Sequence, residues 1–279
     1  MSLRQTRVVE RVVVYLGALL VFVVMAFPLY GVLLTSLQRE EDVRSTDVKF
    51  FPTYVTFEHF AEVLRPGHIV PIREAMTNSV IISVLTAIVT VVLALPATYA
   101  LTRLGLPGRR VIVAALIAVY LFPTLLFVLP IYIQAVQWGL TDTFLGLLIP
   151  YVAFSLPFTI WIMNGFLVSL PVEVEEAAQL DGCNHLQLFT QIVVPLMRPG
   201  IVAGLLMVFI LAWVEFLTPL LFTSELKILP VSLGLYRSTY DIKIGQLAAA
   251  AVLTALPVLA LTAFFQRMIT EVITAGAQR

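Results

Sequence analysis

The carboxylates of one short segment stand out in a chain with few charged residues. Glu173, Glu175, Glu176 and Asp181 lie close together in the segment VEVEEAAQLDGCNHLQLFTQIVVP, residues 172–195. Charged residues make up 12% of the chain, whereas soluble domains contain about 25%. The segment therefore suits either docking into a groove of a soluble partner or a simple connector at the membrane surface.

Residue types needed for catalysis or metal binding are sparse elsewhere. A single cysteine, Cys183, excludes an internal disulfide, and His59, His68 and His185 are scattered without the spacing of metal ligands. The sequence has no GxxxxGK[ST] phosphate-binding loop and no serine–histidine–aspartate arrangement. A formal net charge of zero argues against nucleic acid as a partner. We therefore predict a protein that is not an enzyme and binds no metal or cofactor, so that any ATP and magnesium would be bound by a partner.

Four side chains within the apolar stretches could line a path for cargo. Glu215 is the sole acidic residue clearly inside such a stretch, and an ionisable group in lipid usually faces a cavity or a partner. Trp213 lies beside it, and Asn78 and Asn164 fall in other stretches. Sugars are bound by hydrogen-bonding groups together with aromatic faces, so these residues would suit a carbohydrate. The alternative for Glu215 and the asparagines is hydrogen bonding between helices.

Six apolar stretches must position these groups, since about 20 apolar residues are needed to cross a bilayer. The chain is 60% hydrophobic, and it predicts an all-α polytopic membrane protein whose transmembrane helices are Val12–Leu37, Met76–Thr102, Val111–Gln134, Phe144–Leu167, Ile201–Phe222 and Gln246–Met268. The first stretch is longer than the about 7–15 residues of a signal-peptide core, so we expect it to be retained. The prolines within the stretches either adjust helix packing or act as hinges.

Positive charge near the ends of the stretches sets the predicted orientation. No Lys or Arg occurs in residues 135–143, whereas arginines flank the first three stretches at Arg4, Arg7, Arg11, Arg103, Arg109 and Arg110. We therefore predict that both termini are cytoplasmic. This orientation also places the acidic loop, residues 168–200, on the cytoplasmic side.

The acidic loop is predicted to hold two short helices joined by a bend. Ser169 is expected to cap the first helix, Pro171 fits its first turn, and Gly182 can end it in the left-handed conformation. A second helix follows, with Leu186, Phe189, Ile192 and Val193 at helical spacing, and Pro195 and Pro199-Gly200 are expected to close it. Such a pair could be a simple interfacial connector. The small residues Ala177, Ala178 and Gly182 favour a docking surface, because they allow another protein to approach the backbone.

The same residues carry a resemblance to a known family. Glu176-Ala177-Ala178, Gly182 and Ile192-x-Val194-Pro195 are similar in type and spacing to the EAA loop of ABC importer permeases, although Val194 stands where leucine is usual. The string EEAAQLDGCNHLQLFTQIVVPLMRPG resembles the carbohydrate-importing, MalG-like subclass. PLYGVLLTSLQ, FFPTYVTFEHFAEVL, WGLTDTFLGLLIPY and the tail TAGAQR fit the same subclass.

This resemblance implies a type I ABC importer permease fold and a coupling helix. Residues 1–75 would form a first helix and an outer segment, residues 76–268 the core, and residues 269–279 a cytoplasmic tail. The implied contacts with the ATPase subunit are Glu175, Glu176, Ala177, Ala178, Leu180, Asp181, Gly182 and Phe189. The implied partners are a second homologous permease, a dimer of ATP-binding subunits, an extracytoplasmic substrate-binding protein, a di- or oligosaccharide and the lipid bilayer. The location implied is a bacterial or archaeal plasma membrane.

Two other functions remain open at this level. A permease for glycerol phosphate, a polyol or a polyamine is one, although a phosphate cargo would favour Arg or Lys inside the spans, whose central parts have none. A stand-alone secondary transporter is the other, and it should show several intramembrane carboxylates or paired symmetric halves.

Overall fold

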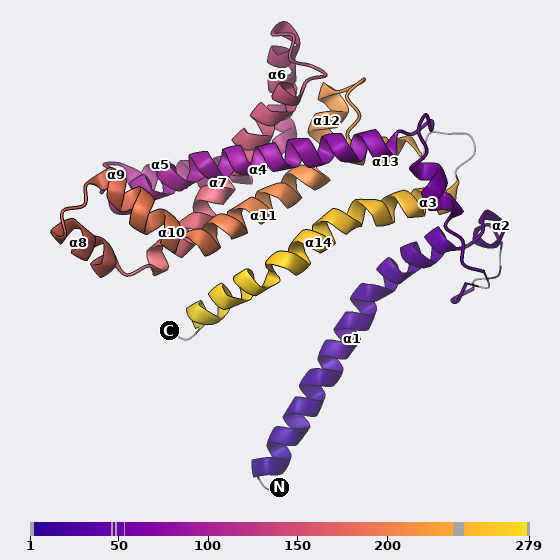
Figure 1. Cartoon of the computed structure of the whole chain (residues 1–279), viewed down its shortest axis with the longest axis horizontal. Coiled ribbons are helices and arrows are strands. Elements are labelled where there is room, and N and C mark those ends of the chain that lie inside the picture. The colour runs from indigo at the N-terminus through magenta and orange to yellow at the C-terminus, as the bar shows by residue number, and fades with distance from the viewer. Residues whose placement is uncertain (1–2, 46, 48, 53, 237–242, 278–279) are drawn as a thin grey trace. The chain divides into compact units, whose positions relative to one another are not determined.

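The structure is a computed structural model that describes the backbone of all residues except 1–2, 46, 48, 53, 237–242 and 278–279. Side chains are described for residues 10–265 outside the same gaps. The described residues form helices and loops (Figure 1), which confirms the all-α fold predicted from the sequence. The chain divides into two compact units, one made of Met1–Arg73 and Leu233–Leu256 and the other of Glu74–Ser232 and Pro257–Arg279. The sequence-based division at residues 75 and 268 stays a prediction.

The first unit begins with a long helix whose apolar side chains are uncovered. The helices that begin in this unit are α1 (Leu3–Leu37), α2 (Glu40–Val43), α3 (Glu58–Val63), α4 (Ile72–Arg103) and α14 (Ile244–Ala277). The segment Glu10–Leu37 has a mean hydropathy of 2.7 and none of its window is buried. A helix that is apolar all round needs lipid or another chain to cover it.

The outer segment after α1 is folded back by hydrogen bonds. The Thr56 N–H donates to the Leu37 carbonyl at 2.9 Å, and the His59 ring bonds the Gln38 carbonyl at 2.9 Å. The same ring packs so closely on Gly245 that a Cβ there would lie 2.2 Å from its Nε2 atom. The outer segment therefore has a defined structure within its own unit, over the residues that the structure describes.

The second unit contains the helices that position the acidic loop. These are α5 (Arg109–Leu121), α6 (Thr124–Gln137), α7 (Phe144–Ser169), α8 (Val172–Leu180), α9 (His185–Gln187), the π-helix η1 (Leu188–Val193), α10 (Val194–Leu196), α11 (Arg198–Val214) and α12 (Leu217–Phe222), with most of α4 and the start of α13 (Leu229–Leu235). The helices α8 and α9 lie at one end of this unit, and α6 and α12 lie away from them (Figure 1).

Helix α7 is the centre of the second unit. It packs against α11, α5, α6 and α12. Its buried residues Met163 and Leu167 share an apolar cluster with Val91 and Ala94 of α4, and glycines of α11 allow close approach. A Cβ added at Gly204 would lie 3.3 Å from the Val91 side chain. Small residues at such crossings are typical of membrane helices, because packing there depends on contact area.

Four described helices are long and apolar enough to cross a membrane, and the number rises to six if each of two bent pairs is one span. The four are Glu10–Leu37, Ile72–Arg103, Phe144–Ser169 and Ile244–Phe265. The bent pairs are Arg109–Leu121 with Thr124–Gln137, at 89°, and His185–Leu196 with Arg198–Val214, at 71°. The polytopic architecture is confirmed at this level.

Two of the predicted spans are interrupted, which the sequence analysis did not anticipate. The span predicted at Val111–Gln134 breaks at Phe122, whose ψ of 142° is extended, because the ring of Pro123 disfavours a helical residue before it. The span predicted at Ile201–Phe222 breaks at Glu215, which has a ψ of 126°. Its carboxylate accepts the Thr218 N–H at 3.0 and 3.2 Å and starts α12 as a new helix.

Candidate functional site

Helix α8 has a well-defined end. Asp181 is its C-cap, and Gly182 follows with a φ of +91°. The Gly182 N–H donates to the Gln179 carbonyl and the Cys183 N–H to the Ala178 carbonyl, both at 3.0 Å. These two bonds form a Schellman motif, which satisfies carbonyls left free at a helix end. The predicted stop at Gly182 is confirmed.

The predicted start of α8 is wrong by two residues. Ser169 ends α7 instead, and its hydroxyl donates to the Phe166 carbonyl at 2.7 Å. Pro171 is the residue before α8, and the first turn carries Glu173 and Glu175. A serine near a helix end can bond backward to its own helix as readily as forward, so the sequence did not distinguish the two.

The two faces of α8 differ in what they present. Glu175 and Ala178 are buried against the chain, three residues apart and thus on one face. Glu176 and Ala177 are exposed, and Leu180 is 90% exposed. Asp181 and Gly182 extend the exposed side at the bend. The outward surface therefore combines an apolar side chain, carboxylates and small residues, which suits contact with another protein.

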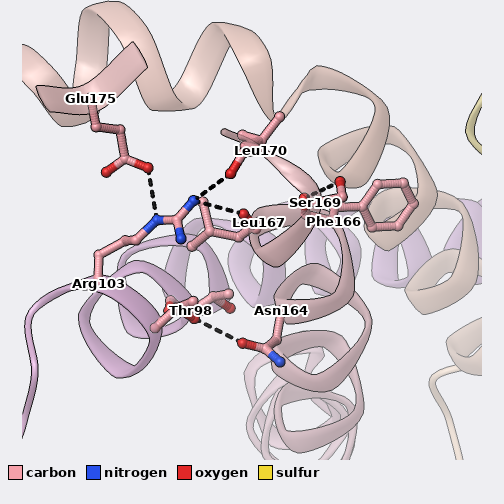
Figure 2. A network of polar contacts seen from close by, with 9 residues as sticks. Thr98, Arg103, Asn164, Phe166, Leu167, Ser169, Leu170 and Glu175 are labelled. Carbon is pink, nitrogen blue, oxygen red and sulfur yellow. Dashed lines mark hydrogen bonds and ion pairs between the residues drawn. The ribbon is translucent and has the colours of Figure 1, made fainter. Parts of the chain in front are cut away.

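Glu175 is held by Arg103, the last residue of α4 (Figure 2). The Arg103 Nε lies 2.7 Å from the Glu175 Oε1, and its Nη2 donates to the carbonyls of Leu167 at 3.0 Å and Leu170 at 2.9 Å. The side chains of Arg103 and Glu175 are 14% and 8% exposed. This cluster, which we call the Arg103 clamp, joins the end of α4, the end of α7 and the inner face of α8.

The clamp changes the role assigned to Glu175. The sequence analysis placed it among the contacts with the ATPase, but its carboxylate faces its own chain and is almost fully buried. The sequence analysis noted Arg103 only as a marker of orientation. Arg103 ends an apolar stretch, and a cation is favoured near the free carbonyls at the end of a helix. This local feature was the one sign in the sequence that Arg103 could bind the end of a neighbouring helix. Arg103 and Glu175 are 72 positions apart in the sequence, so local patterns could not predict that they pair.

The segment that follows the bend at Gly182 packs against α8. Asn184 begins it with a capping box, accepting the Gln187 N–H at 2.9 Å while the Gln187 side chain accepts the Asn184 N–H at 3.0 Å. The π-helix η1 then buries Leu188 and Val193, and α8 packs against it. Phe189 is half-buried with its ring 5.3 Å from that of Tyr99, so the residue predicted as a partner contact packs mainly on its own chain.

The second helix ends at Leu196, between Pro195 and Pro199-Gly200, as the sequence predicts. Pro195 lies inside α10, and Pro199 lies in the first turn of α11. The segment His185–Leu196 and helix α11 are separated by a short break and meet at an angle of 71°. Proline is tolerated in a first turn, where its missing N–H would be unpaired anyway. Leu186, one of the apolar residues at helical spacing in the predicted second helix, is 71% exposed and adds to the outward apolar surface.

The predicted cargo residues do not come together. Asn78 donates to the Lys227 carbonyl at 3.0 Å, and Trp213 is 1% exposed with its ring stacked on Phe209 at 5.6 Å. Both fit structural roles in this structure rather than the predicted contact with cargo. Asn164 is exposed and accepts a hydrogen bond from the Thr102 hydroxyl at 2.8 Å, near the Arg103 clamp (Figure 2).

Asn164 lines two other pockets, each with Leu101 and Val113, and Glu215 borders a separate one. Glu215 lines a cavity of about 210 Å³ together with Tyr151, Ser155 and several aromatic residues. The bond from the Thr218 N–H satisfies part of its carboxylate, and the rest of the side chain borders the cavity. The location of Glu215 beside a cavity is therefore compatible with the predicted role on the path of the cargo.

One polar contact outside the membrane spans was not predicted. Asp142, with a φ of +55°, accepts the Ser224, Glu225 and Leu226 N–H groups at 2.6, 2.8 and 3.1 Å and the Ser224 hydroxyl at 2.7 Å. Burial raises the pKa of Asp142, but these hydrogen bonds, led by that of the Ser224 hydroxyl, outweigh it and lower the pKa to about 2. Asp142 therefore ties the loop before α7 to the loop after α12.

These features define a class of protein. Several apolar spans, two broken helices that border one cavity and an exposed acidic helix held on the ends of two spans describe a multi-pass membrane protein. The chain belongs to the family described as "Binding-protein-dependent transport system inner membrane component", which matches residues 91–273. It is a non-catalytic, multi-pass permease component of an ABC transporter, and the family implies an ATPase and a binding protein as partners.

Similar proteins share nearly the whole length of the chain. The chain is 34% identical over 272 residues to the inner membrane ABC transporter permease protein YcjP of Escherichia coli, which covers 97% of each. It is 34% identical over 235 residues to the trehalose transport system permease protein SugB of Mycobacterium tuberculosis, which covers 83% of this chain and 85% of SugB. A crystal structure of a bacterial ABC transporter involved in alginate import contains a chain with the same fold, at a TM-score of 0.76, 22% identity, and coverage of 96% and 98%.

Proposed function

We propose that this chain is a transmembrane subunit of an ABC importer for a di- or oligosaccharide. The relatives named for sugar transport support a carbohydrate cargo, because trehalose SugB aligns with more than four-fifths of the chain. The observation that carries the coupling role is the exposed face of α8 on a helix that its own chain anchors. An exposed leucine among carboxylates and small residues suits a surface that docks on another protein.

In this proposal α8 is the coupling helix. Glu176, Ala177, Leu180, Asp181 and Gly182 meet the ATPase, since they form the outward surface. Ala178, Glu175 and Phe189 face the chain itself and hold α8 on the rest of the protein. Motion of the ATPase is passed through the Arg103 clamp to the ends of α4 and α7.

The proposed assembly has two permeases and a cytoplasmic motor. This chain pairs with a second, related permease, and two ATP-binding subunits bind the coupling helices, while an extracytoplasmic binding protein delivers the sugar. Both termini and α8 face the cytoplasm, with the outer segments of the first unit toward the binding protein. Binding of ATP closes the ATPase dimer and opens the outer side, and hydrolysis returns the transporter to the inward-open state.

Reconstitution tests this proposal. Proteoliposomes with both permeases, the ATPase and the binding protein should take up radiolabelled sugar when ATP is enclosed, and vesicles lacking the ATPase should not. The cargo is first chosen by the thermal shift of the binding protein across trehalose, maltose and diacetylchitobiose. Uptake by vesicles holding only this chain would refute the dependence on a motor, and a binding protein stabilised by a polyamine or glycerol phosphate instead would refute the carbohydrate.

A further inference from the structure

We propose that the cavity beside Glu215 is a binding site for one ring of the sugar, which gives this subunit a direct contact with cargo. The inference rests on the proposed function and adds a site to it. The cavity of about 210 Å³ lies within the second unit, between the breaks of two helices and the middle of α7.

Both helix interruptions border this one cavity. Tyr120, Phe122 and Thr124 line it from the break between α5 and α6, and Leu211 and Glu215 line it from the break after α11. The first break is central, with 13 residues of α5 before it and 14 of α6 after it. Irregular backbone at the depth of a membrane is tolerated where it lines a cavity, and binding sites are built from such discontinuous helices.

Aromatic rings form a fixed wall around the cavity. Phe127 lies 6.0 Å from Phe122 and 6.5 Å from Phe154, and Tyr120 stacks on Phe158 at 5.1 Å. All of these rings except that of Phe158 line the cavity. Because their neighbours hold them, they present faces to an incoming ring without ordering first, and the C–H face of a sugar packs on aromatic faces.

Two oxygen-bearing groups that line the same cavity can receive sugar hydroxyls. Tyr151 is buried and lines the cavity beside Glu215, and its hydroxyl lies near the Glu215 carboxylate without meeting the geometry of a regular hydrogen bond. The Glu215 carboxylate has accepting capacity beyond its bond to the Thr218 N–H. A sugar hydroxyl can accept from the Tyr151 hydroxyl and donate to the Glu215 carboxylate, and hydrogen bonds to a charged group in a buried site are among the stronger ones.

A neutral sugar fits this site better than a cation. Aromatic faces with a carboxylate could also hold an ammonium group, but the Thr218 N–H and the start of α12 already offset the charge of Glu215. The volume is also smaller than the about 300–1,000 Å³ of a site for a drug-sized ligand. The cavity therefore admits one ring, and the remainder of a disaccharide would extend toward the second permease.

Protection of a single cysteine from labelling tests the site. In the complete transporter, Cys183→Ala removes the native thiol and Ser155→Cys places a near-isosteric thiol in the cavity. A neutral thiol reagent should label this cysteine, and trehalose, maltose or diacetylchitobiose should slow the labelling. A sugar at about ten times its Kd slows it about tenfold. Gly165→Cys, exposed on the same helix and outside the cavity, is the matched control and should not be protected.

Variants of the wall separate cargo binding from assembly. Phe154→Ala and Tyr151→Phe should lower sugar protection and uptake severalfold while the ATPase still co-purifies with the variant. Tyr132→Phe, on α6 against Phe222 and outside the cavity, is the control. No labelling of Ser155→Cys, no protection by the sugar that the wild-type transporter imports, or protection by spermidine instead would overturn the site. Failure of uptake by the wild-type transporter would count against the proposed function itself.

Discussion

Replacing Arg103 with alanine should detach α8 from the membrane domain without preventing the fold. The change removes the ion pair with Glu175 at 2.7 Å and the hydrogen bonds to the Leu167 and Leu170 carbonyls. Glu175, with 8% of its side chain exposed, then has a buried charge without its partner. The least costly response is for α8 to swing away until water reaches that carboxylate.

The size of the effect follows from the burial of the pair. Breaking a buried ion pair by removing one partner costs about 3–5 kcal/mol. Because about 1.4 kcal/mol corresponds to a factor of ten, the detached population of α8 should rise at least about 100-fold. Arg103→Lys keeps the charge but loses the planar fork that reaches three acceptors, so its effect should be intermediate. Glu175→Gln should also be intermediate, since an amide oxygen still accepts a hydrogen bond.

Hydrogen exchange and transport give two independent measurements of this prediction. The α8 amides of Arg103→Ala should exchange about 100-fold faster in the purified transporter, while those in the centre of α7 should be unchanged. Sugar transported per ATP hydrolysed should fall. Arg110→Ala, an exposed arginine at the start of α5, is the matched control. Wild-type exchange and coupling in Arg103→Ala would refute the idea that the clamp positions α8.

Two further substitutions test local structure. Asp142→Asn should lower the free energy of unfolding by about 1–2 kcal/mol at neutral pH, because bonds to a charged acceptor are stronger. The folded pKa of about 2 lies below the ordinary 3.8, so this stabilisation is complete above about pH 4 and is lost as pH falls toward 2. Melting curves of wild type and Asp142→Asn should therefore converge in acid, and a constant gap would contradict the assignment. Gly182→Ala should cost about 1–2 kcal/mol from its φ of +91° alone, since no atom lies within 4 Å of the added Cβ. Gly165→Ala, also in open space but in a helix, should instead stabilise by about 0.5–1 kcal/mol, and equal effects would refute the backbone explanation.

Local signals in the sequence were enough for the spans and the acidic helix. Hydropathy located the apolar segments, and the glycine at 182 located the end of α8, because both depend on neighbouring residues alone. The break at Phe122 was also open to prediction, since the residue before a proline avoids helical geometry. The break was missed because the residues on both sides of it are apolar and read as one continuous span.

The contacts between distant segments were beyond local patterns. Arg103 and Glu175 meet because the end of α4 packs on the end of α7, next to α8. Asp142 accepts hydrogen bonds from residues 224–226, which are more than 80 positions away in the sequence. Trp213 looked like a residue for binding sugar, yet whether an aromatic residue on an apolar helix faces a core or a cavity depends on its packing partners. Glu215 was recognised because an acidic residue in a span is rare for a physical reason.

The most direct test of the account is whether the outward face of α8 holds the ATPase. Glu176→Arg and Glu225→Arg make the same reversal of charge on exposed residues, the first on α8 and the second in the loop after α12. Both variants should reach the membrane, and we predict that the ATPase co-purifies with Glu225→Arg but is lost from Glu176→Arg. Full recovery of the ATPase with Glu176→Arg would contradict the claim that this helix is the docking surface.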